Sequence, residues 1–179
     1  STKADYWIPI RPETDAAFWL GVTRIMVDKG WYDEKFVKQF TDFPLLVRTD
    51  TLARLRADEV FAGYKPALSK EGVSFKTQGL TDEQYAKIGD RVVWDAKTNR
   101  PAAITRDDVG KRLDAKGIDP ALDGTWKVKL VDGSDVEIQT LWSLYQVHLK
   151  DYDLDTVAEI THSPKVFIER LAKDIWETT

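Results

Sequence analysis

One short turn near the start of the chain carries residue types that suit a polar ligand. Thr14 and Asp15 follow Arg11-Pro12-Glu13 and precede apolar residues at helical spacing. The first backbone N–H groups of a helix have no partner within the helix, so they favour anionic oxygens such as those of phosphate. A carboxylate there only accepts hydrogen bonds, and it suits donors such as a guanine edge or a ribose hydroxyl. A plain helix cap with a charged first turn is the alternative, and it is the commoner use of these residue types.

The elements that would position this turn are a short extended run and an amphipathic helix. Aromatic and β-branched residues over Tyr6–Ile10 favour an edge or terminal strand. Pro12 disfavours the helical region for Arg11, so we expect the helix to begin after Pro12 with Thr14 as its cap. Gly30 is placed to end this helix. The apolar residues that share its inner face are Phe18, Val22, Ile25 and Met26.

The rest of the chain predicts helices on both sides of a strand-bearing middle. Helices are indicated over 32–40, 51–58, 81–88, 105–117 and 155–160, from Thr140 onward, and again from Ser163-Pro164. Strands are predicted over 91–95 and 101–104. Alternation around Asp132-Gly133 predicts a hairpin that pairs 126–131 with 135–139. The predicted fold class is therefore α/β or α+β, rich in helix, with a small antiparallel hairpin insertion.

Composition excludes several kinds of protein and site. A chain of 179 residues with 42% hydrophobic and 31% charged residues fits one globular domain. The net charge of −4 argues against a nucleic-acid surface, and no apolar run is long enough to span a membrane. The absence of Cys excludes disulfides, thiolate metal sites and iron–sulfur ligation by these residues. His148 and His162 lack the spacing of a zinc site, so we predict no metal site and no catalytic residue.

Three motifs follow one another within about the first fifty residues. Residues 4–17 fit the pattern Ala-Asp-x-Trp-(apolar)-x-(apolar)-Arg-Pro-Gly/Gln-Thr-Asp-x-Ala, residues 30–37 read Gly-Trp-Tyr-Asp-Glu-Lys-Phe-Val, and residues 40–51 read Phe-Thr-Asp-Phe-Pro-Leu-Leu-Val-Arg-Thr-Asp-Thr. Together they resemble the large catalytic subunits of the dimethyl sulfoxide reductase family of molybdenum enzymes. The third motif resembles the branch of respiratory nitrate reductase, nitrite oxidoreductase, (per)chlorate reductase and ethylbenzene dehydrogenase. One residue departs from the pattern, because Glu13 stands where the family usually has Gly or Gln.

The resemblance implies a particular role for the turn. Glu13, Thr14 and Asp15 correspond to the three positions that contact the guanosine part of a molybdopterin guanine dinucleotide, with Glu13 contributing only its backbone. Arg11 would be a neighbour of the phosphates. In the family, the protein ligand to molybdenum and the cysteines of an iron–sulfur cluster lie upstream of this stretch. These residues would therefore hold part of the cofactor-binding shell and none of the redox centre.

Two hypotheses of function remain at this point. In the first, the chain is part of a molybdenum-dependent oxidoreductase subunit that acts on a small oxyanion or a hydrocarbon, and the chain alone is inactive. The implied cofactors are molybdenum bis(molybdopterin guanine dinucleotide) and an iron–sulfur cluster outside this segment. In the second, the chain is a self-standing acidic interaction domain without catalysis.

The first hypothesis also implies partners and segments. The partners would be an iron–sulfur electron-transfer β subunit of a membrane-associated prokaryotic complex, together with the remainder of the catalytic subunit. Nucleic acid and direct membrane insertion are not expected. Residues 1–58 would be a cofactor-side α/β segment, residues 59–139 a branch-specific insertion with short strands, and residues 140–179 a returning helical segment, all packed as one unit.

Overall fold

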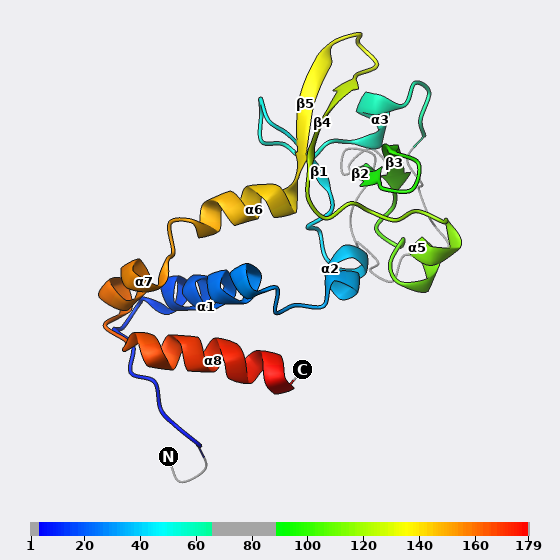
Figure 1. The fold of residues 1–179 in the computed structure, drawn as a ribbon. Coiled ribbons are helices and arrows are strands. Elements are labelled where there is room, and N and C mark those ends of the chain that lie inside the picture. Colours follow the sequence, from blue (N-terminus) through cyan, green and yellow to red (C-terminus); the bar gives the residue numbers. More distant parts are fainter. Residues whose placement is uncertain (1–3, 66–88, 179) are drawn as a thin grey trace, which may run out of the picture. The chain divides into compact units, whose positions relative to one another are not determined.

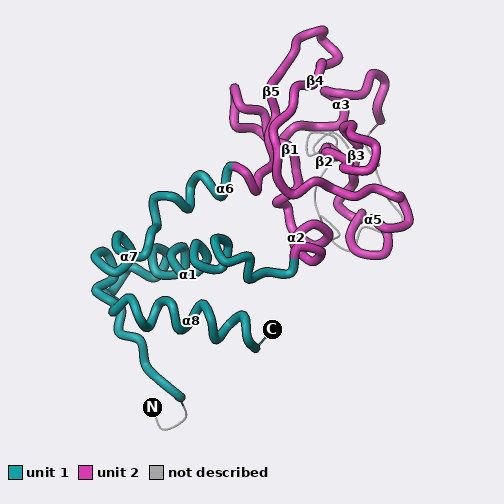
Figure 2. The backbone as a smooth tube through the Cα atoms, viewed as in Figure 1, with its two compact units in different colours: residues 1–33, 144–179 teal, residues 34–143 magenta. Residues whose placement is uncertain are grey.

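The structure is a computed structural model that describes residues 4–65 and 89–178. The chain divides into two compact units (Figure 2). Residues 1–33 and 144–179 form one, here called the helical unit, and residues 34–143 form the other, called the strand unit. The helix predicted over 81–88 lies outside the described residues.

Three helices build the core of the helical unit (Figure 1). They are α1 (Asp15–Lys29), α7 (Leu154–Thr161) and α8 (Lys165–Thr178), and α6 (Leu141–Leu149) begins in the strand unit and ends in this one. Gly30 ends α1 in the left-handed region at φ 67°, as predicted, and its N–H donates to the carbonyl of Val27. The buried residues at the centre are Phe18, Val22, Val157, Ile168 and Ala172. Of the predicted face of α1, Phe18 and Val22 are therefore buried, and Ile25 and Met26 pack against this cluster partly buried.

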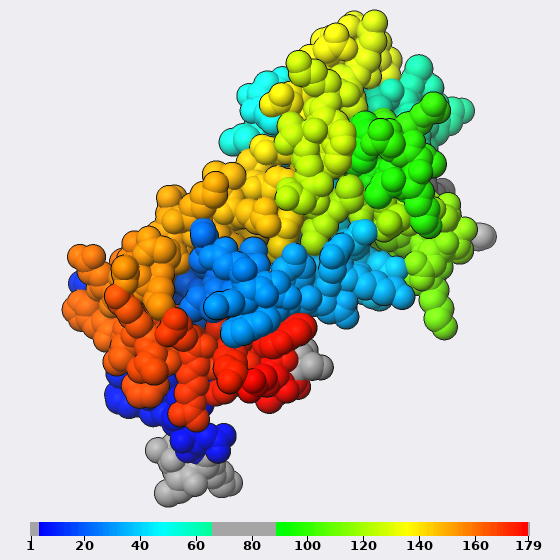
Figure 3. Space-filling model, viewed as in Figure 1, coloured from blue at the N-terminus to red at the C-terminus, as the bar shows by residue number. Residues whose placement is uncertain are grey.

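The strand predicted over Tyr6–Ile10 is wrong. The segment is extended, but within the described residues its polar groups bond to α8 and to the turn before it instead of to a neighbouring strand. The hydroxyl of Tyr6 donates to Asp174 at 2.7 Å, and that of Ser163 donates to the carbonyl of Pro9. Ile8 and Ile10 pack on the helical core, and Figure 3 shows the dark blue N-terminal residues against orange ones from the end of the chain.

Two antiparallel sheets are present in the described part of the strand unit. One sheet has the order β1-β5-β4, and the other pairs β2 with β3. The elements are α2 (Glu34–Phe40), β1 (Leu46–Arg48), α3 (Ala57–Val60), β2 (Arg91–Asp95), β3 (Arg100–Ile104), α5 (Lys111–Ala115), β4 (Thr125–Lys129) and β5 (Asp135–Thr140). The core residues are Leu46, Leu55, Ala57, Val92, Trp94, Val128, Leu130, Val136 and Ile138.

The predictions for this unit that depend only on neighbouring residues are confirmed. β2 and β3 lie at the predicted strands, and α2 lies within 32–40. β4 and β5 form the predicted hairpin, in which Gly133 takes φ 90° and its N–H donates to the carbonyl of Leu130 at 3.0 Å. Asp132 accepts hydrogen bonds from the N–H and the hydroxyl of Ser134. The mixed, helix-rich fold class is confirmed as well.

Two predicted helices are shorter than expected, because backbone N–H groups in these segments bond to distant residues or to side chains instead of within a helix. Over 51–58 only Ala57 onward is helical, since the N–H of Leu55 donates to the carbonyl of Leu46 at 2.8 Å and so pairs the segment with β1. Over 105–117 the helix is only Lys111–Ala115, because Asp108 accepts the N–H of Thr105 and forms a turn first. Among the described residues, no helix has the length and apolar character needed to cross a membrane.

Candidate functional site

The turn before α1 lies on the surface of the helical unit. Arg11, Glu13 and Asp15 are exposed and Thr14 is half-buried. Within the described residues, the side chains of Arg11, Glu13 and Asp15 make no hydrogen bond or ion pair. The helix begins at Asp15, as predicted, so an exposed carboxylate stands at its positive end. The turn therefore presents one cation, two anions and the start of a helix at the surface.

Glu13 adopts an unusual backbone conformation for its residue type. Its φ is 68°, in the left-handed region. Glycine takes this conformation freely, whereas an L-residue with a side chain is disfavoured there by roughly 1–2 kcal/mol. The conformation gives a physical reason for glycine in the family pattern at this position.

Thr14 does not cap α1 as predicted. Its hydroxyl donates instead to the carbonyl of Arg11 at 2.6 Å, and its N–H reaches the same oxygen at 3.3 Å. Both bonds tie Thr14 back across the turn, and the side chain forms no cap bond. The first-turn N–H groups of α1 are thus left without a cap from Thr14.

The end of α7 anchors the turn. The backbone N–H of Arg11 donates to the carbonyl of Thr161 at 2.7 Å, and the buried hydroxyl of Thr161 donates to the carbonyl of Val157. His162 then ends α7 in the left-handed region at φ 57°. Sequence reasoning did not find the roles of Thr161 and Ser163, which bond to the backbone at Arg11 and Pro9. Each of these bonds joins residues that are far apart in the chain. The sequence marked Ser163 only as the start of the last predicted helix.

No candidate metal centre was found in the described ranges. Within residues 4–65 and 89–178, no group of three or more His, Cys, Asp or Glu side chains could hold a metal ion. The helix predicted over 155–160 begins one residue earlier as α7, and Asp153 caps it by accepting the N–H of Thr156 at 2.9 Å. His148 in α6 lies edge-on to the ring of Tyr152, with the ring centroids 5.3 Å apart.

Comparison with known proteins places the chain in a class. No family model matches it. The α subunit of respiratory nitrate reductase from Haloferax mediterranei is 31% identical over 175 residues, which are 97% of this chain and 16% of that protein. The α subunit of perchlorate reductase from Dechloromonas aromatica is 27% identical over 96% of this chain and 19% of its own length. The dopamine dehydroxylase of Eggerthella lenta is 28% identical over 95% of this chain and 22% of its own length.

The chain is a relative of the catalytic α subunits of the dimethyl sulfoxide reductase family of molybdenum enzymes, as its three motifs predicted. Within that family, its relatives include the nitrate and perchlorate reductases of the predicted branch. The chain spans less than a quarter of the length of the three relatives named above, at 16%, 19% and 22%.

Proposed function

We propose that this chain is part of the catalytic subunit of a molybdenum-dependent oxidoreductase, and that the turn before α1 binds the guanosine part of a molybdopterin guanine dinucleotide. The observation that carries the proposal is the turn itself. Thr14 and Asp15 stand at the positions of the family motif, at the start of α1, and the Asp15 carboxylate is exposed with no polar partner among the described residues. The similarity to catalytic subunits over almost the whole chain supports the same interpretation.

The chemistry of each side chain fits a nucleotide. An ionised Asp15 only accepts, and the Watson–Crick edge of guanine offers adjacent N–H donors, as the ribose offers hydroxyls. The exposed guanidinium of Arg11 suits phosphate oxygens, because it presents paired N–H donors in one plane. Glu13 turns the backbone and contributes no side-chain contact to the nucleotide.

The remaining parts of the proposal concern the complete subunit. Such a cofactor would supply redox chemistry at molybdenum, on a small oxyanion or a hydrocarbon, and the residues described here would bind and orient its nucleotide. Electrons would be carried by an iron–sulfur β subunit, and by an iron–sulfur cluster elsewhere in the catalytic subunit. The alternative of a self-standing interaction domain receives no support from the relatives.

The proposal is tested by replacing Asp15 in the complete subunit. Asp15→Ala removes the ionised acceptor, whose hydrogen bonds are worth about 1.5–3 kcal/mol each, so cofactor retention should weaken roughly tenfold or more. Asp15→Asn keeps one acceptor oxygen and should lose less. Molybdenum and guanine nucleotide are measured per folded subunit.

A matched control separates binding from helix stability. Asp155→Ala removes an exposed acid, which pairs with Lys165, from the first turn of α7, another helix of the same unit. It should lower thermal stability slightly and leave cofactor content unchanged. Full cofactor occupancy in folded Asp15→Ala would show that Asp15 only stabilises its own helix, and the proposal would be wrong.

A further inference from the structure

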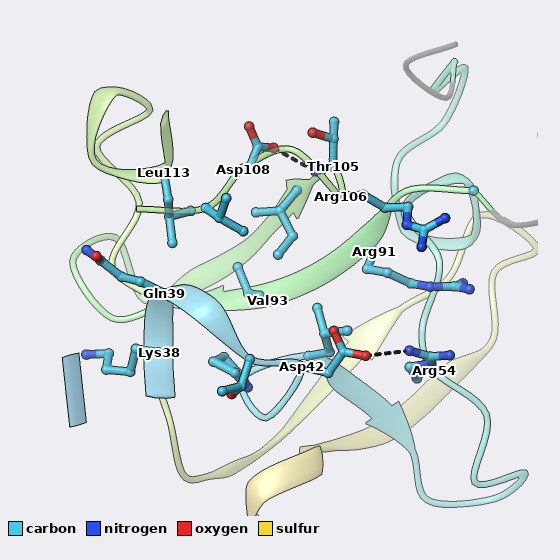
Figure 4. A pocket seen from close by; sticks show the side chains of 16 residues that line it. Lys38, Gln39, Asp42, Arg54, Arg91, Val93, Thr105, Arg106, Asp108 and Leu113 are labelled. Atoms are coloured by element: carbon cyan, nitrogen blue, oxygen red, sulfur yellow. Dashed lines mark hydrogen bonds and ion pairs between the residues drawn. The ribbon is translucent and has the colours of Figure 1, made fainter. Parts of the chain in front are cut away.

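A pocket in the strand unit lies apart in sequence from the motif residues of the turn. It has a volume of about 240 Å³ and is lined by residues from α2, β2, the end of β3 and the segment that leads to α5 (Figure 4). Its apolar wall includes Leu45, Val93, Ile104 and Leu113. Among residues 4–65 and 89–178, its charged lining consists of four cations and two anions, namely Lys38, Arg54, Arg91, Arg106, Asp42 and Asp108.

Most of these charges are already neutralised. Arg54 pairs with Asp42 at 2.9 Å, and Lys38 pairs with Asp119 at 2.7 Å. Asp108 pairs with Lys116. Arg91 and Arg106 differ, because neither makes a hydrogen bond or an ion pair within residues 4–65 and 89–178. The pocket therefore has two guanidinium groups without an ion pair in that part of the chain.

Arg91 is the less favourably placed of the two cations. It is half-buried at the start of β2, and Arg106 is exposed. Burial lowers the pKa of Arg91 and the positive charges of Arg54 and Arg56 lower it further, whereas the negative charges of Asp42 and Glu59 offset only part of that shift. Arginine nevertheless keeps its charge in proteins, so a partly desolvated guanidinium near like charges is destabilising unless an anion joins it.

The geometry directs these cations to one place. Figure 4 shows the guanidinium groups of Arg54, Arg91 and Arg106 in a row along the same end of the pocket. We propose that this pocket binds a dianionic oxyanion of the phosphate type, held between Arg91 and Arg106 with Arg54 beside them. Two guanidinium groups that have no ion pair among the described residues match two negative charges, and each can donate a pair of N–H bonds to neighbouring oxygens. This site is independent of the proposed nucleotide site.

The test is a calorimetric titration of the protein with inorganic phosphate, under mildly alkaline conditions where phosphate is a dianion. Acetate is the monoanion control and should bind more weakly. Glycerol 3-phosphate, titrated in parallel, distinguishes a bound phosphate ester from the free ion, and tighter binding of either than of acetate supports the site. Arg91→Gln should weaken phosphate binding about tenfold or more, because it removes a charged bidentate donor.

Two further variants keep the test decisive. Because Arg106 is exposed, Arg106→Gln should leave the core undisturbed. It should also weaken phosphate binding. Arg112→Gln in α5 removes an exposed arginine that does not line the pocket, and it should leave binding unchanged. Without phosphate, Arg91→Gln should melt at or above the temperature of the unchanged protein, since it removes a half-buried cation that has no ion pair among the described residues.

Three results would overturn the proposal. The first is no saturable binding of phosphate or glycerol 3-phosphate to the unchanged protein. The second is binding of acetate as tight as that of phosphate. The third is equal weakening by Arg91→Gln and Arg112→Gln, which would show attraction to surface charge in general.

Discussion

At the scale of single residues, Glu13 combines an unfavourable backbone angle with a position in the proposed nucleotide site. Its φ of 68° carries a conformational cost that glycine would not have. The sequence marked Glu13 as the departure from the family pattern, and the backbone supplies the physical meaning of that departure. Thr14 and Asp15 could be located from local signals alone, whereas the supports from Thr161 and Ser163 could not.

We expect Glu13→Gly to stabilise the protein. Relief of the left-handed strain exceeds the entropy that glycine loses on folding, so the free energy of unfolding should rise by about 0.5–1 kcal/mol. Glu13→Val, with a β-branched side chain at the same angle, should lower it. Chemical denaturation of the three proteins measures both changes. Equal stability of the Gly and Val variants would mean that residue 13 is not held at positive φ.

Asp95 is a second residue whose environment makes a prediction, here for stability against pH. It is buried at the end of β2 and accepts from the N–H of Asp119 at 3.0 Å, the hydroxyl of Thr98 at 2.7 Å and the N–H of Lys97 at 3.2 Å. Burial acts to raise the pKa of Asp95, but these hydrogen bonds together outweigh it, and the pKa is lowered. The carboxylate is thus more stable in the folded than in the unfolded chain.

The sign of the resulting pH dependence follows from that lowered pKa. The stabilisation by Asp95 is fully present above the unfolded pKa of about 4, and it is lost as the pH falls through the lower folded pKa. Asp95→Asn should cost about 1–3 kcal/mol at neutral pH, because the amide accepts fewer of these bonds. The cost should shrink in acid. A cost that stays constant from neutral pH to strongly acidic pH would contradict this assignment.

At the scale of elements, α1 and α7 approach each other closely at one glycine. A Cβ atom built on Gly21 would lie 2.7 Å from both methyl carbons of Val157, whose side chain is fully buried. The absence of a side chain at residue 21 therefore sets how near the two helices lie.

A double-mutant cycle tests this contact. Gly21→Ala should lower the free energy of unfolding by about 1–2 kcal/mol, because overpacking exceeds the gain in helix propensity. Val157→Ala alone should also destabilise, through a cavity. In the double variant the new methyl group fills part of that cavity, so the cost should be smaller than the sum. Strict additivity would show that the two helices do not meet at this pair.

An element could be predicted from the sequence when its hydrogen-bond partners are neighbours in the chain, and could not when the partners are distant. The end of α1 at Gly30 and the hairpin at Gly133 depend on neighbouring residues, and both were predicted. The segment around Leu55 has apolar residues at helical spacing, but it pairs with β1, and pairing between distant segments leaves no local pattern. The strand predicted over Tyr6–Ile10 failed for the same reason, since α8 and its preceding turn supply its partners.

At the scale of the whole molecule, the two proposed sites belong to different units. The nucleotide-binding turn lies in the helical unit, and the anion pocket lies in the strand unit. The motifs in residues 4–51 predicted the first site, whereas no motif marked Arg91 and Arg106 of the pocket, because the residues that line the pocket are far apart in the chain. The segment bounds 1–58, 59–139 and 140–179 stay a prediction. The relatives extend well beyond this chain, so the central claim has to be tested in the complete subunit.

The most direct measurement is an experimental structure of the complete subunit with its cofactor bound. We expect N–H donors of guanine or hydroxyls of the ribose to lie within about 3.2 Å of the Asp15 carboxylate, with the nucleotide at the start of α1. A guanosine bound elsewhere, with the Asp15 carboxylate facing solvent, would contradict the proposed role of the turn.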